Sequence, residues 1–393
     1  MSERTERSEG RENMPSQHSM SECTERSEGR ENMPSQHSMS ECTERSEGRE
    51  NMPSQHSMSE RTERSEGREN MTGQHSMSER TERSEGRENM TGQHGMSGVP
   101  RVVVVGDVIT DVLAVLSGPL ATGSDTAAGI RFSGGGQAAN TAAWLAGQGA
   151  AVTLVAAVGD DETGRERVAE LTRAGVDCVV ERHEGYPTGT VIVLTHGGER
   201  TMVSQRGANL RLTAGHVDAA LAAAPDVGHL HLSAYTLLDV GSRGAGLRAL
   251  AAARERGLTV SVDAASAAPL RRVGGSFLTW VRDVDLLLVN TDEATVLTGG
   301  LDPAAQARAL TSVAHRVVVK RGAAGAVWVE RGGRVETAPA PGVAVVDVTG
   351  AGDAFAAGLL TAWLAGADPR AALARAGDLG ALAVTTVGAR PTR

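Results

Sequence analysis

Residues 343–365 read VAVVDVTGAGDAFAAGLLTAWLA, and the fold can be worked out from this stretch outward. The β-branched run Val343–Val346 predicts a strand, the glycine-rich segment 347–352 a turn, and the apolar run Ala354–Ala365 a helix. Small residues in the turn let a ligand approach the backbone closely. The first N–H groups of a helix lack internal partners and lie at the positive end of its dipole. The segment therefore predicts an anion site, suited to phosphate and to phosphoryl transfer.

Asp353 follows this turn directly and has two interpretations. Its carboxylate could accept a proton from a substrate hydroxyl while a phosphoryl group is held against the helix N–H groups. Aspartate is also a common N-cap residue, and glycine-rich turns before helices are frequent. The residues alone leave the two interpretations open.

Short apolar strands alternate with alanine-rich helices through the rest of this region, which predicts an α/β fold with a mainly parallel sheet. The expected strands are Val102–Val105, Val152–Ala157, His229–Leu232, Thr259–Asp263, Leu286–Asn290 and Arg316–Lys320. The expected helices are Ala138–Ala146, Gly164–Ala174, Ala219–Ala224, Gly244–Arg256, Pro303–Val313, Ala354–Ala365 and Pro369–Val384, with a short one over 292–297. Segments 112–133 and 189–205 break the alternation, and we expect them to form a small projecting β-sheet that serves as a lid.

Residues 1–95 are five near-identical copies of a 19-residue unit, MSERTERSEGRENMPSQHS. The unit contains no Leu, Ile, Val, Phe, Tyr or Trp, so stacked copies would have no core to offset the cost of ordering the chain. We expect this segment to be disordered, and a recent tandem duplication explains it better than a spacer or interaction segment. The folded domain then spans 96–393, and Met96 resembles a natural start.

The chain carries a net charge of −9, and most of it falls in the repeat. The near-neutral remainder lacks the clustered positive charge that binding to nucleic acid or an anionic membrane requires. Three cysteines, Cys23, Cys42 and Cys178, do not form a disulfide framework and suit a reducing compartment. No run of 18 apolar residues occurs. We therefore expect a soluble, cytoplasmic protein.

Two motifs give the chain a family resemblance. The segment Asp347–Asp353, followed by a helix, resembles the C-terminal signature of the ribokinase-like, or PfkB, carbohydrate kinases. Gly135–Asn140 reads GGQAAN and resembles their N-terminal signature, and Val158–Gly164 follows with the expected Gly-x-Asp-x-x-Gly spacing. The resemblance covers about 102–389. It implies a three-layer α/β/α sandwich with a small β lid and an ATP- and Mg²⁺-dependent kinase of small sugars.

The resemblance assigns roles at the phosphoryl and acceptor sites. Asp353 would be the catalytic base, and Gly350, Ala351 and Gly352 would form the anion hole. Asp111 would bind a substrate hydroxyl from the end of the first strand, where a turn or cap residue is the alternative. The acceptor pocket would further be lined by Gly135, Gly136 and Asn140.

The resemblance also assigns a nucleotide site. Asn290 and Glu293 match an Asn-x-x-Glu motif in which Glu293 would hold Mg²⁺ through water, and a helix-capping segment is the alternative. Nucleotide-binding roles also fall to Lys320, Gly322, Gly325 and Thr349, with a solvated turn as the alternative for 320–325. Asp347, with the loop near Gly388, would hold a monovalent cation such as K⁺.

Three departures bear on the acceptor. Ile109, Gln137 and Ser233 stand where ribokinases carry Asn, Lys and a carboxylate, so the contacts expected for ribose are missing. A nucleoside or a 2-keto-3-deoxy sugar acid therefore remains an alternative to a neutral sugar. Arg206 could face an anionic acceptor, although we expect it at the surface.

One interpretation from another enzyme class is an NAD(P)-dependent Rossmann oxidoreductase. Residues 134–139 fit G-x-G-x-x-A, with Asp160 and Asp161 about 20 residues further on. The fingerprint should follow the first strand at once, whereas these glycines come nearly 30 residues after Val105. No Walker A pattern occurs either. A homodimer formed through the lid is a further expectation from the resemblance.

The disorder expected for residues 1–95 yields a prediction. Deleting them should leave the rate of acceptor-dependent ADP release within about twofold of that of the intact chain, because a segment with so few apolar side chains supplies no packed core. Steady-state kinetics on both proteins checks this. A large loss would show that the repeat contributes to the folded part.

Overall fold

The computed structural model describes residues 99–197, 199–300 and 302–391. The N-terminal repeat, and with it the disorder expected for residues 1–95, lies outside these residues. Within the described part none of the helices combines the length and the apolar character that crossing a membrane requires.

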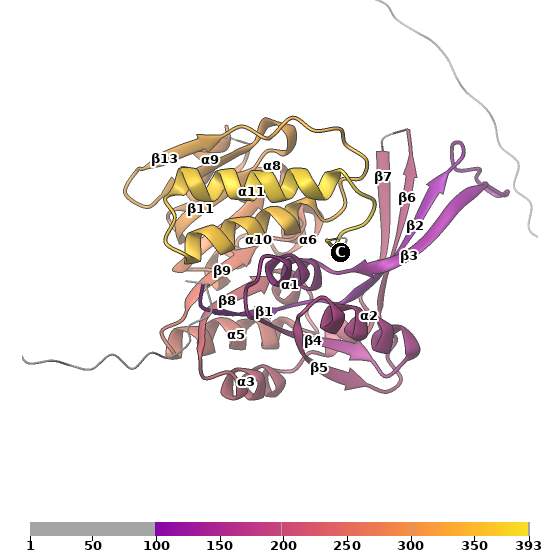
Figure 1. Cartoon of the computed structure of the whole chain (residues 1–393), viewed down its shortest axis with the longest axis horizontal. Helices are drawn as coiled ribbons and strands as arrows, with labels where there is room; N and C mark the ends of the chain where they lie inside the picture. The colour runs from indigo at the N-terminus through magenta and orange to yellow at the C-terminus, as the bar shows by residue number, and fades with distance from the viewer. Residues whose placement is uncertain (1–98, 198, 301, 392–393) are drawn as a thin grey trace, which may run out of the picture. The chain divides into compact units, whose positions relative to one another are not determined.

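The larger of the two sheets forms the centre of the domain (Figure 1). Among the described residues its strand order is β13-β12-β11-β10-β9-β8-β1-β4-β5, parallel except for the pairs that β12 makes with β11 and β13. The bounds are β1 Arg101–Val105, β4 Val152–Gly159, β5 Asp177–His183, β8 Val227–Ser233, β9 Thr259–Asp263, β10 Val284–Asn290, β11 Ala314–Lys320, β12 Ala326–Glu330 and β13 Val335–Ala338. All six strands expected from the apolar runs are present. Parallel strands place their carboxyl ends at one edge, where ligand sites form.

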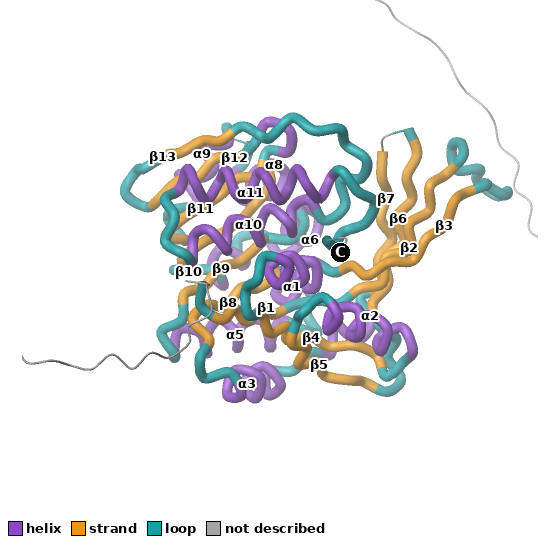
Figure 2. Tube along the Cα trace, in the orientation of Figure 1, coloured by secondary structure: helices purple, strands orange, loops and turns teal. Residues whose placement is uncertain are grey.

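Helices cover both faces of this sheet, as the tube in Figure 2 shows. One face packs against α1 Gln137–Gly147, α2 Glu162–Arg173, α10 Ala351–Leu364 and α11 Pro369–Val384. The other packs against α3 Ala214–Ala223, α4 Tyr235–Leu238, α5 Arg243–Glu255, α6 Ala267–Val273, α7 Ser276–Trp280, α8 Thr291–Thr298 and α9 Pro303–Leu310. Short 3-10 turns lie at η1 Gly207–Arg211 and η2 Gly322–Ala324. The result is the expected three-layer α/β/α sandwich with two apolar cores.

The two segments that break the alternation form a second sheet with the order β3-β2-β6-β7. Its strands are β2 Ile109–Leu116, β3 Ala128–Gly135, β6 Gly189–His196 and β7 Glu199–Gln205. Figure 1 shows this sheet projecting from the sandwich. Its pairing places Val112, Phe132, Ile192 and Val203 side by side on one face, and Phe132 is 72% exposed.

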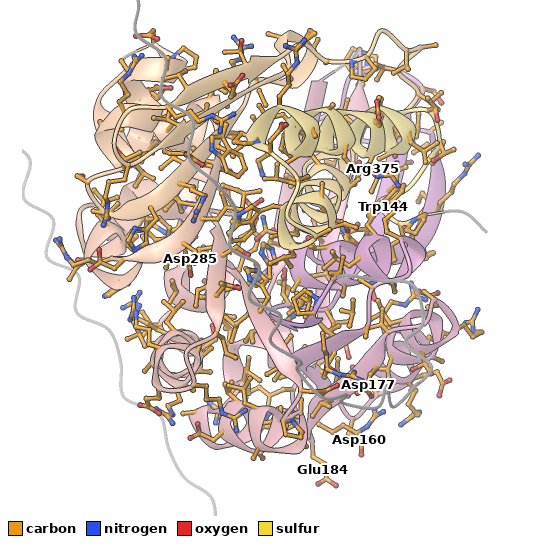
Figure 3. The ribbon with its side chains drawn as sticks, turned by 60° about the vertical axis from the view of Figure 1, so that its left-hand side comes forward. Trp144, Asp160, Asp177, Glu184, Asp285 and Arg375 are labelled. Atoms are coloured by element: carbon orange, nitrogen blue, oxygen red, sulfur yellow. The ribbon has the colours of Figure 1, made fainter. Side chains whose placement is uncertain are left out.

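Side chains fill the space between the layers (Figure 3). Trp144 of α1, labelled there, is 3% exposed and donates its indole N–H to the carbonyl of Ala389 at 3.0 Å. This bond holds the C-terminal segment against the helix layer. Residues 389 and 390 are thereby brought beside the start of α1.

The prediction of a strand over Val343–Val346 is wrong. These residues form an irregular segment between β13 and α10, and Val345 is 63% exposed. Pro339, Pro341 and Gly342 come directly before it. Proline cannot donate to a ladder, and glycine weakens a strand. The β-branched residues therefore line a surface instead of pairing.

The turn after β11 offers a matched pair of substitutions. Gly325 has φ +84°, and a Cβ there would collide with the backbone carbonyl of Ala338. Gly322 also has a positive φ, of +56°, but a Cβ there would meet nothing within 4 Å. We predict that Gly322→Ala lowers the free energy of unfolding by about 1 kcal/mol and Gly325→Ala by roughly 3 kcal/mol or more. Urea unfolding of both variants measures this, and equal losses would contradict the collision.

Candidate active site

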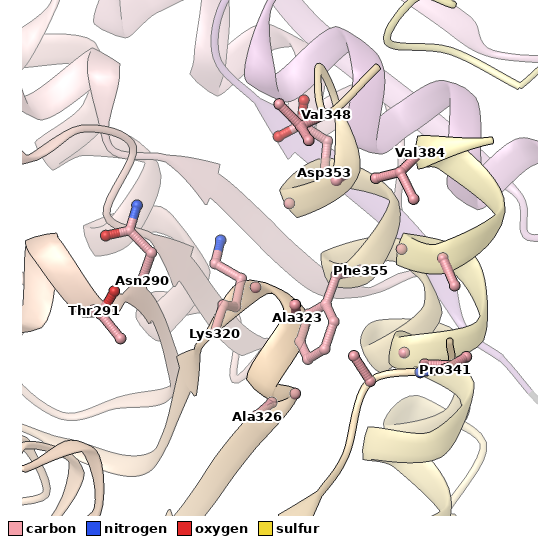
Figure 4. Close-up of a pocket in the computed structure, with 18 of the residues that line it drawn as sticks. Asn290, Thr291, Lys320, Ala323, Ala326, Pro341, Val348, Asp353, Phe355 and Val384 are labelled. Carbon is pink, nitrogen blue, oxygen red and sulfur yellow. The ribbon is translucent and has the colours of Figure 1, made fainter. Parts of the chain in front are cut away.

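A cavity of about 720 Å³ opens at the carboxyl edge of the large sheet, beside the start of α10. Figure 4 shows Asn290 and Lys320 on one side of it, Asp353 and Phe355 from α10 on another, and Val384 and Pro341 completing the wall. The lining includes all the predicted residues of the anion hole and most of those of the nucleotide site: Gly350, Ala351, Gly352, Asn290, Glu293, Lys320, Gly322 and Gly325. The segment around Gly350–Gly352 and the predicted nucleotide-binding residues of 290–325 therefore meet at one cavity.

The helix start is built on Gly350, which is the N-cap of α10 with φ +76°. A Cβ at this position would collide with the backbone of Ala389, so only glycine fits. The N–H of Ala351 donates to the carbonyl of Val348 at 3.3 Å, and the N–H of Asp353 to that of Gly350 at 3.1 Å. These two N–H groups therefore have partners inside the turn, contrary to the expectation that they are free, and the turn presents the positive end of the helix to the cavity.

Asp353 is the third residue of α10, not its N-cap, and makes no side-chain cap bond to the helix. Its Oδ2 instead accepts a hydrogen bond from Nδ2 of Asn140 at 2.9 Å. Burial raises the pKa of Asp353 to about 8, with Asp263 and Asp107 adding to the rise and Asn140 and Lys320 opposing it. The N-cap interpretation is excluded, and the carboxyl has a pKa suited to proton exchange near neutral pH.

Asn140 is fixed by two opposite contacts. Its Nδ2 donates to Asp353, while its Oδ1 accepts from Nε of Arg390 at 3.2 Å. Arg390 also donates to the carbonyl of Gly135 at 3.0 Å and to Glu170 at 3.3 Å. Burial lowers the pKa of Arg390 to about 10. Sequence reasoning missed Arg390, because a lone arginine near the C-terminus belongs to no motif.

Asp111 lies on β2 of the small sheet, not at the end of the first strand as expected. The chain leaves β1 at Val105 and enters β2 at Ile109, which carries Asp111 to the base of the projecting sheet. Burial raises the pKa of Asp111 to about 6, and Arg390 opposes the rise. A Cβ on Gly135 would collide with this carboxylate, so a side chain there would displace Asp111.

The start of α1 is held by Asp107, a second residue that sequence reasoning passed over. Gly136 caps the helix at φ +97°, and a Cβ there would lie 2.6 Å from the carbonyl oxygen of Asp107. The Asp107 carboxylate accepts from the N–H of Ala138 at 3.2 Å. It also accepts from Ser233 at 3.4 Å, and the Ser233 hydroxyl lies 2.6 Å from Gln137.

Arg206 does not lie at the surface, contrary to expectation. Its guanidinium is 16% exposed, donates to Asp107 at 3.2 Å and to Asp239 at 3.1 Å, and stacks 4.2 Å from the ring centre of Tyr235. Two carboxylates and an aromatic face offset the cost of burying the cation. Because Asp107 holds the start of α1, Arg206 lies beside that helix start.

Glu293 and Asn290 form a capping box at the start of α8. The carboxylate of Glu293 accepts from the N–H and the side-chain amide of Asn290, at 2.8 and 2.7 Å, and the residue is 2% exposed. Burial raises the pKa of Glu293 to about 7. The capping alternative is therefore correct as a description of the local structure, and the capped residues also line the cavity.

Lys320, the single lysine of the chain, reaches across β10 to Asp263 and donates to its Oδ2 at 2.6 Å. Burial alone would lower the pKa of Lys320, but Asp263 and Glu293 raise it above the ordinary value. Its Nζ lies 3.6 Å from where a Cβ of Gly352 would be, which places the ammonium at the anion turn. The partner Asp263, 1% exposed, was not predicted.

Asp347 and Thr349 shape the turn before α10. One oxygen of Asp347 accepts from the N–H and hydroxyl of Thr349 at 2.9 and 2.7 Å, and the other accepts from the N–H of Gly388 at 3.0 Å. The expected proximity of Asp347 to the loop near Gly388 is therefore present. These bonds tie the C-terminal loop to the anion turn.

The glycines that fit a dinucleotide-binding fingerprint do not lie where a Rossmann fold places them, directly after the first strand. Gly134 and Gly135 end β3 of the small sheet instead of following β1. Asp161 caps α2 and accepts from the N–H of Gly164 at 2.7 Å. The strand before α1 therefore belongs to the small sheet and pairs antiparallel with β2, so the parallel βαβ unit of a Rossmann fingerprint is missing.

Comparison with known proteins points to one family. The model of the "pfkB family carbohydrate kinase" matches residues 99–393. An ATP-dependent ribose-1-phosphate kinase of Halopiger xanaduensis is 34% identical over 296 residues, covering 74% of this chain and 94% of that protein. A 2-dehydro-3-deoxygluconokinase of Thermoproteus tenax is 34% identical over 250 residues, covering 61% and 76%.

Among solved structures, an adenosine kinase from Sinorhizobium meliloti aligns with a TM-score of 0.67 at 22% identity, covering 74% of this chain and 96% of that one. A putative ribokinase II from E. coli in complex with ATP and Mg²⁺ aligns with a TM-score of 0.66 at 23% identity, covering 74% and 94%. These likenesses show the ribokinase-like fold. Together with the family match and the two glycine-built helix starts, they establish that this chain belongs to the pfkB family of carbohydrate kinases.

Proposed function

We propose that the chain transfers the γ-phosphoryl group of ATP to a hydroxyl of a small sugar or sugar-like acceptor, with Asp353 as the general base. The observation that carries the proposal is the position of Asp353, at the anion turn and bonded to Asn140 at 2.9 Å. A carboxylate there faces both a site for phosphate and the acceptor side of the fold.

The reaction follows from these neighbours. Asp353 takes the proton of the acceptor hydroxyl as the new oxygen–phosphorus bond forms and the bond to the β-phosphate oxygen breaks, releasing ADP. Gly350, Ala351 and Gly352 would form the anion hole for the transferred group, with the Ala351 N–H giving up its 3.3 Å bond to Val348, and Lys320 adds a positive charge beside them. Asn140 orients the base.

ATP would occupy the 720 Å³ cavity. The apolar wall formed by Pro341, Val343, Phe355 and Val384 suits a base. Lys320, Gly322 and Gly325, which also line the cavity, and Thr349 of the turn before α10 would contact the phosphates. We assign Asn290 and Glu293 to the same nucleotide site.

Mg²⁺ fits this site through water. Both oxygens of Glu293 already accept from Asn290, yet each keeps a lone pair for a water proton. The described residues contain no cluster of three or more His, Cys, Asp or Glu side chains able to hold a metal. Mg²⁺ usually keeps several waters and takes ligands from substrate phosphates. When bound, it would neutralise charge on the phosphates.

We assign a monovalent cation such as K⁺ to Asp347 and the Gly388 loop.

The acceptor pocket would lie between Asp111, Gly135, Gly136 and Asn140. An acidic sugar is a second candidate, because two relatives are named for a phosphorylated and an acidic sugar. Arg206 could contact such an acceptor only by giving up part of its pairing with Asp107 and Asp239. A nucleoside remains a third.

We further propose that the small sheet closes over the acceptor as a lid, and that its face formed by Val112, Phe132, Ile192 and Val203 pairs two copies of the chain. We also propose that the enzyme is cytoplasmic.

The base assignment predicts the effect of one substitution. Asp353→Asn should lower kcat by at least ~10²-fold, because the amide cannot accept the proton. Asp368→Asn is the matched control: Asp368 is a true N-cap, accepting from Ala371 at the start of α11, and its loss should leave kcat within about twofold. ADP release from MgATP over a panel of sugars, sugar acids and nucleosides provides the measurement. Full activity in Asp353→Asn would refute the assignment.

The raised pKa of Asp353 predicts a pH profile. The base works only as carboxylate, and its pKa is about 8, so kcat/KM should fall about tenfold per pH unit as the pH drops below 8. Asn140→Ala removes a donor that lowers this pKa, so the midpoint of the acid limb should move to higher pH. A midpoint near pH 4, or one unchanged by Asn140→Ala, would contradict the account.

A further inference from the structure

The two central strands β8 and β9 carry polar side chains on one face of the sheet and apolar side chains on the other. Toward α10 they carry paired polar side chains: His229 opposite Thr259 and His231 opposite Ser261. The opposite face is apolar, with Leu230 opposite Val260. His229, His231 and Ser261 are fully buried, and the ring of His229 meets Trp363 of α10 edge to face. We name His229, His231, Thr259 and Ser261 the histidine column.

The column is one continuous chain of hydrogen bonds. Nδ1 of His229 lies 2.8 Å from the Thr259 hydroxyl, and its Nε2 lies 2.7 Å from the Ser261 hydroxyl. Nδ1 of His231 lies 2.8 Å from that same hydroxyl. Burial lowers the pKa of His229 to about 3 and that of His231 to about 4, so both rings are neutral at pH 7.

Proton counting then fixes both tautomers. The Ser261 hydroxyl has one proton, so it donates to one ring and accepts from the other. The two histidines must therefore carry their protons on the same type of nitrogen. The Thr259 hydroxyl lies 3.1 Å from the carbonyl of Gly228 and donates to it, so it accepts from Nδ1–H of His229. Both rings are then protonated on Nδ1.

This assignment leaves Nε2 of His231 as a bare lone pair. It is fully buried, and among the described residues it has no hydrogen-bond partner. Buried polar atoms without partners are rare and call for an explanation. Asp263 is two residues beyond Ser261 on the same face of β9, so the pair that Asp263 makes with Lys320 lies on the face of the sheet that carries the His231 ring. The electrostatic effects of Asp263 and Lys320 on the His231 ring agree with that position.

We propose that His231 is a positioning residue: its Nε2, which makes no hydrogen bond in this structure, accepts a second N–H of the Lys320 ammonium after a rotation of the lysine side chain beside Asp263, and so directs the ammonium at the anion turn of Gly350–Gly352. An ammonium has three N–H donors, and Asp263 takes one of them. A neutral acceptor on the second strand holds the cation without adding a charge that would compete with phosphate. The histidine column supplies that acceptor by locking the tautomer. The inference rests on the proposed function only in giving the anion turn a phosphate.

Two nuclear magnetic resonance measurements test the inference without any turnover. The ¹⁵N shifts of the imidazoles should show Nδ1–H and bare Nε2 for both His229 and His231 at pH 7. Because Lys320 is the single lysine, a lysine-labelled chain gives one side-chain signal. Its titration midpoint should fall in His231→Phe, which removes the acceptor. Protonated Nε2 on His231, or an unmoved Lys320 signal, would overturn the proposal even in a chain without kinase activity.

Kinetics separates positioning from packing. We expect His231→Phe to lower kcat/KM for MgATP at least about tenfold, the scale of a hydrogen bond to a charged group. His231→Gln should recover most of it, since its carbonyl can accept and its amide can donate to Ser261. Leu230→Ala is the control, being equally buried on the opposite face. It should lower the melting temperature and leave kcat/KM unchanged. Equal effects of Leu230→Ala and His231→Phe on kcat/KM would reduce the role of His231 to packing.

Discussion

The hydrogen bond from Asn140 to Asp353 joins two helix starts that are 213 residues apart in sequence. Each start depends on a glycine with positive φ, Gly136 for α1 and Gly350 for α10, where a side chain would collide with neighbouring backbone. The two turns can approach only because both are free of Cβ atoms. The rest of the site is arranged around this contact, with the nucleotide cavity on one side and Asp111, Arg206 and Arg390 on the other.

Burial of charge gives the site its chemistry. Asp353, Asp263 and Asp107 lie close enough to raise the pKa of Asp353, and a single buried lysine opposes them. Each cation near the acceptor is likewise matched: Arg206 by Asp107 and Asp239, Arg390 by Glu170. Breaking one such pair would leave an uncompensated buried charge, which costs far more than a surface pair contributes. Because the buried positive and negative charges nearly balance, many ionisable groups can lie at one edge of the sheet.

The alternation of apolar strands and alanine-rich helices was enough to predict an α/β fold with a mainly parallel sheet, because buried parallel strands and their covering helices follow from local pattern. The three-layer sandwich came from the family resemblance. The segment Val343–Val346 shows where local pattern fails: β-branched residues favour a strand, but the prolines before it prevent pairing. Motifs predicted the residues at both helix starts. They could not predict Asp107, Asp263, Arg206 or Arg390, which reach the site through long-range contacts. The histidine column was equally hidden, because His229–Leu232 reads as an ordinary buried strand.

The central claim is that Asp353 faces an acceptor hydroxyl across a phosphoryl group held by the turn at Gly350. A crystal structure with ADP, Mg²⁺, an acceptor and a planar fluoride analogue of the phosphoryl group tests it most directly. The account predicts the analogue against the N–H groups of the turn and near Lys320, with the acceptor oxygen within hydrogen-bond distance of Asp353. An analogue bound elsewhere, or an acceptor whose hydroxyl contacts a different base, would contradict it.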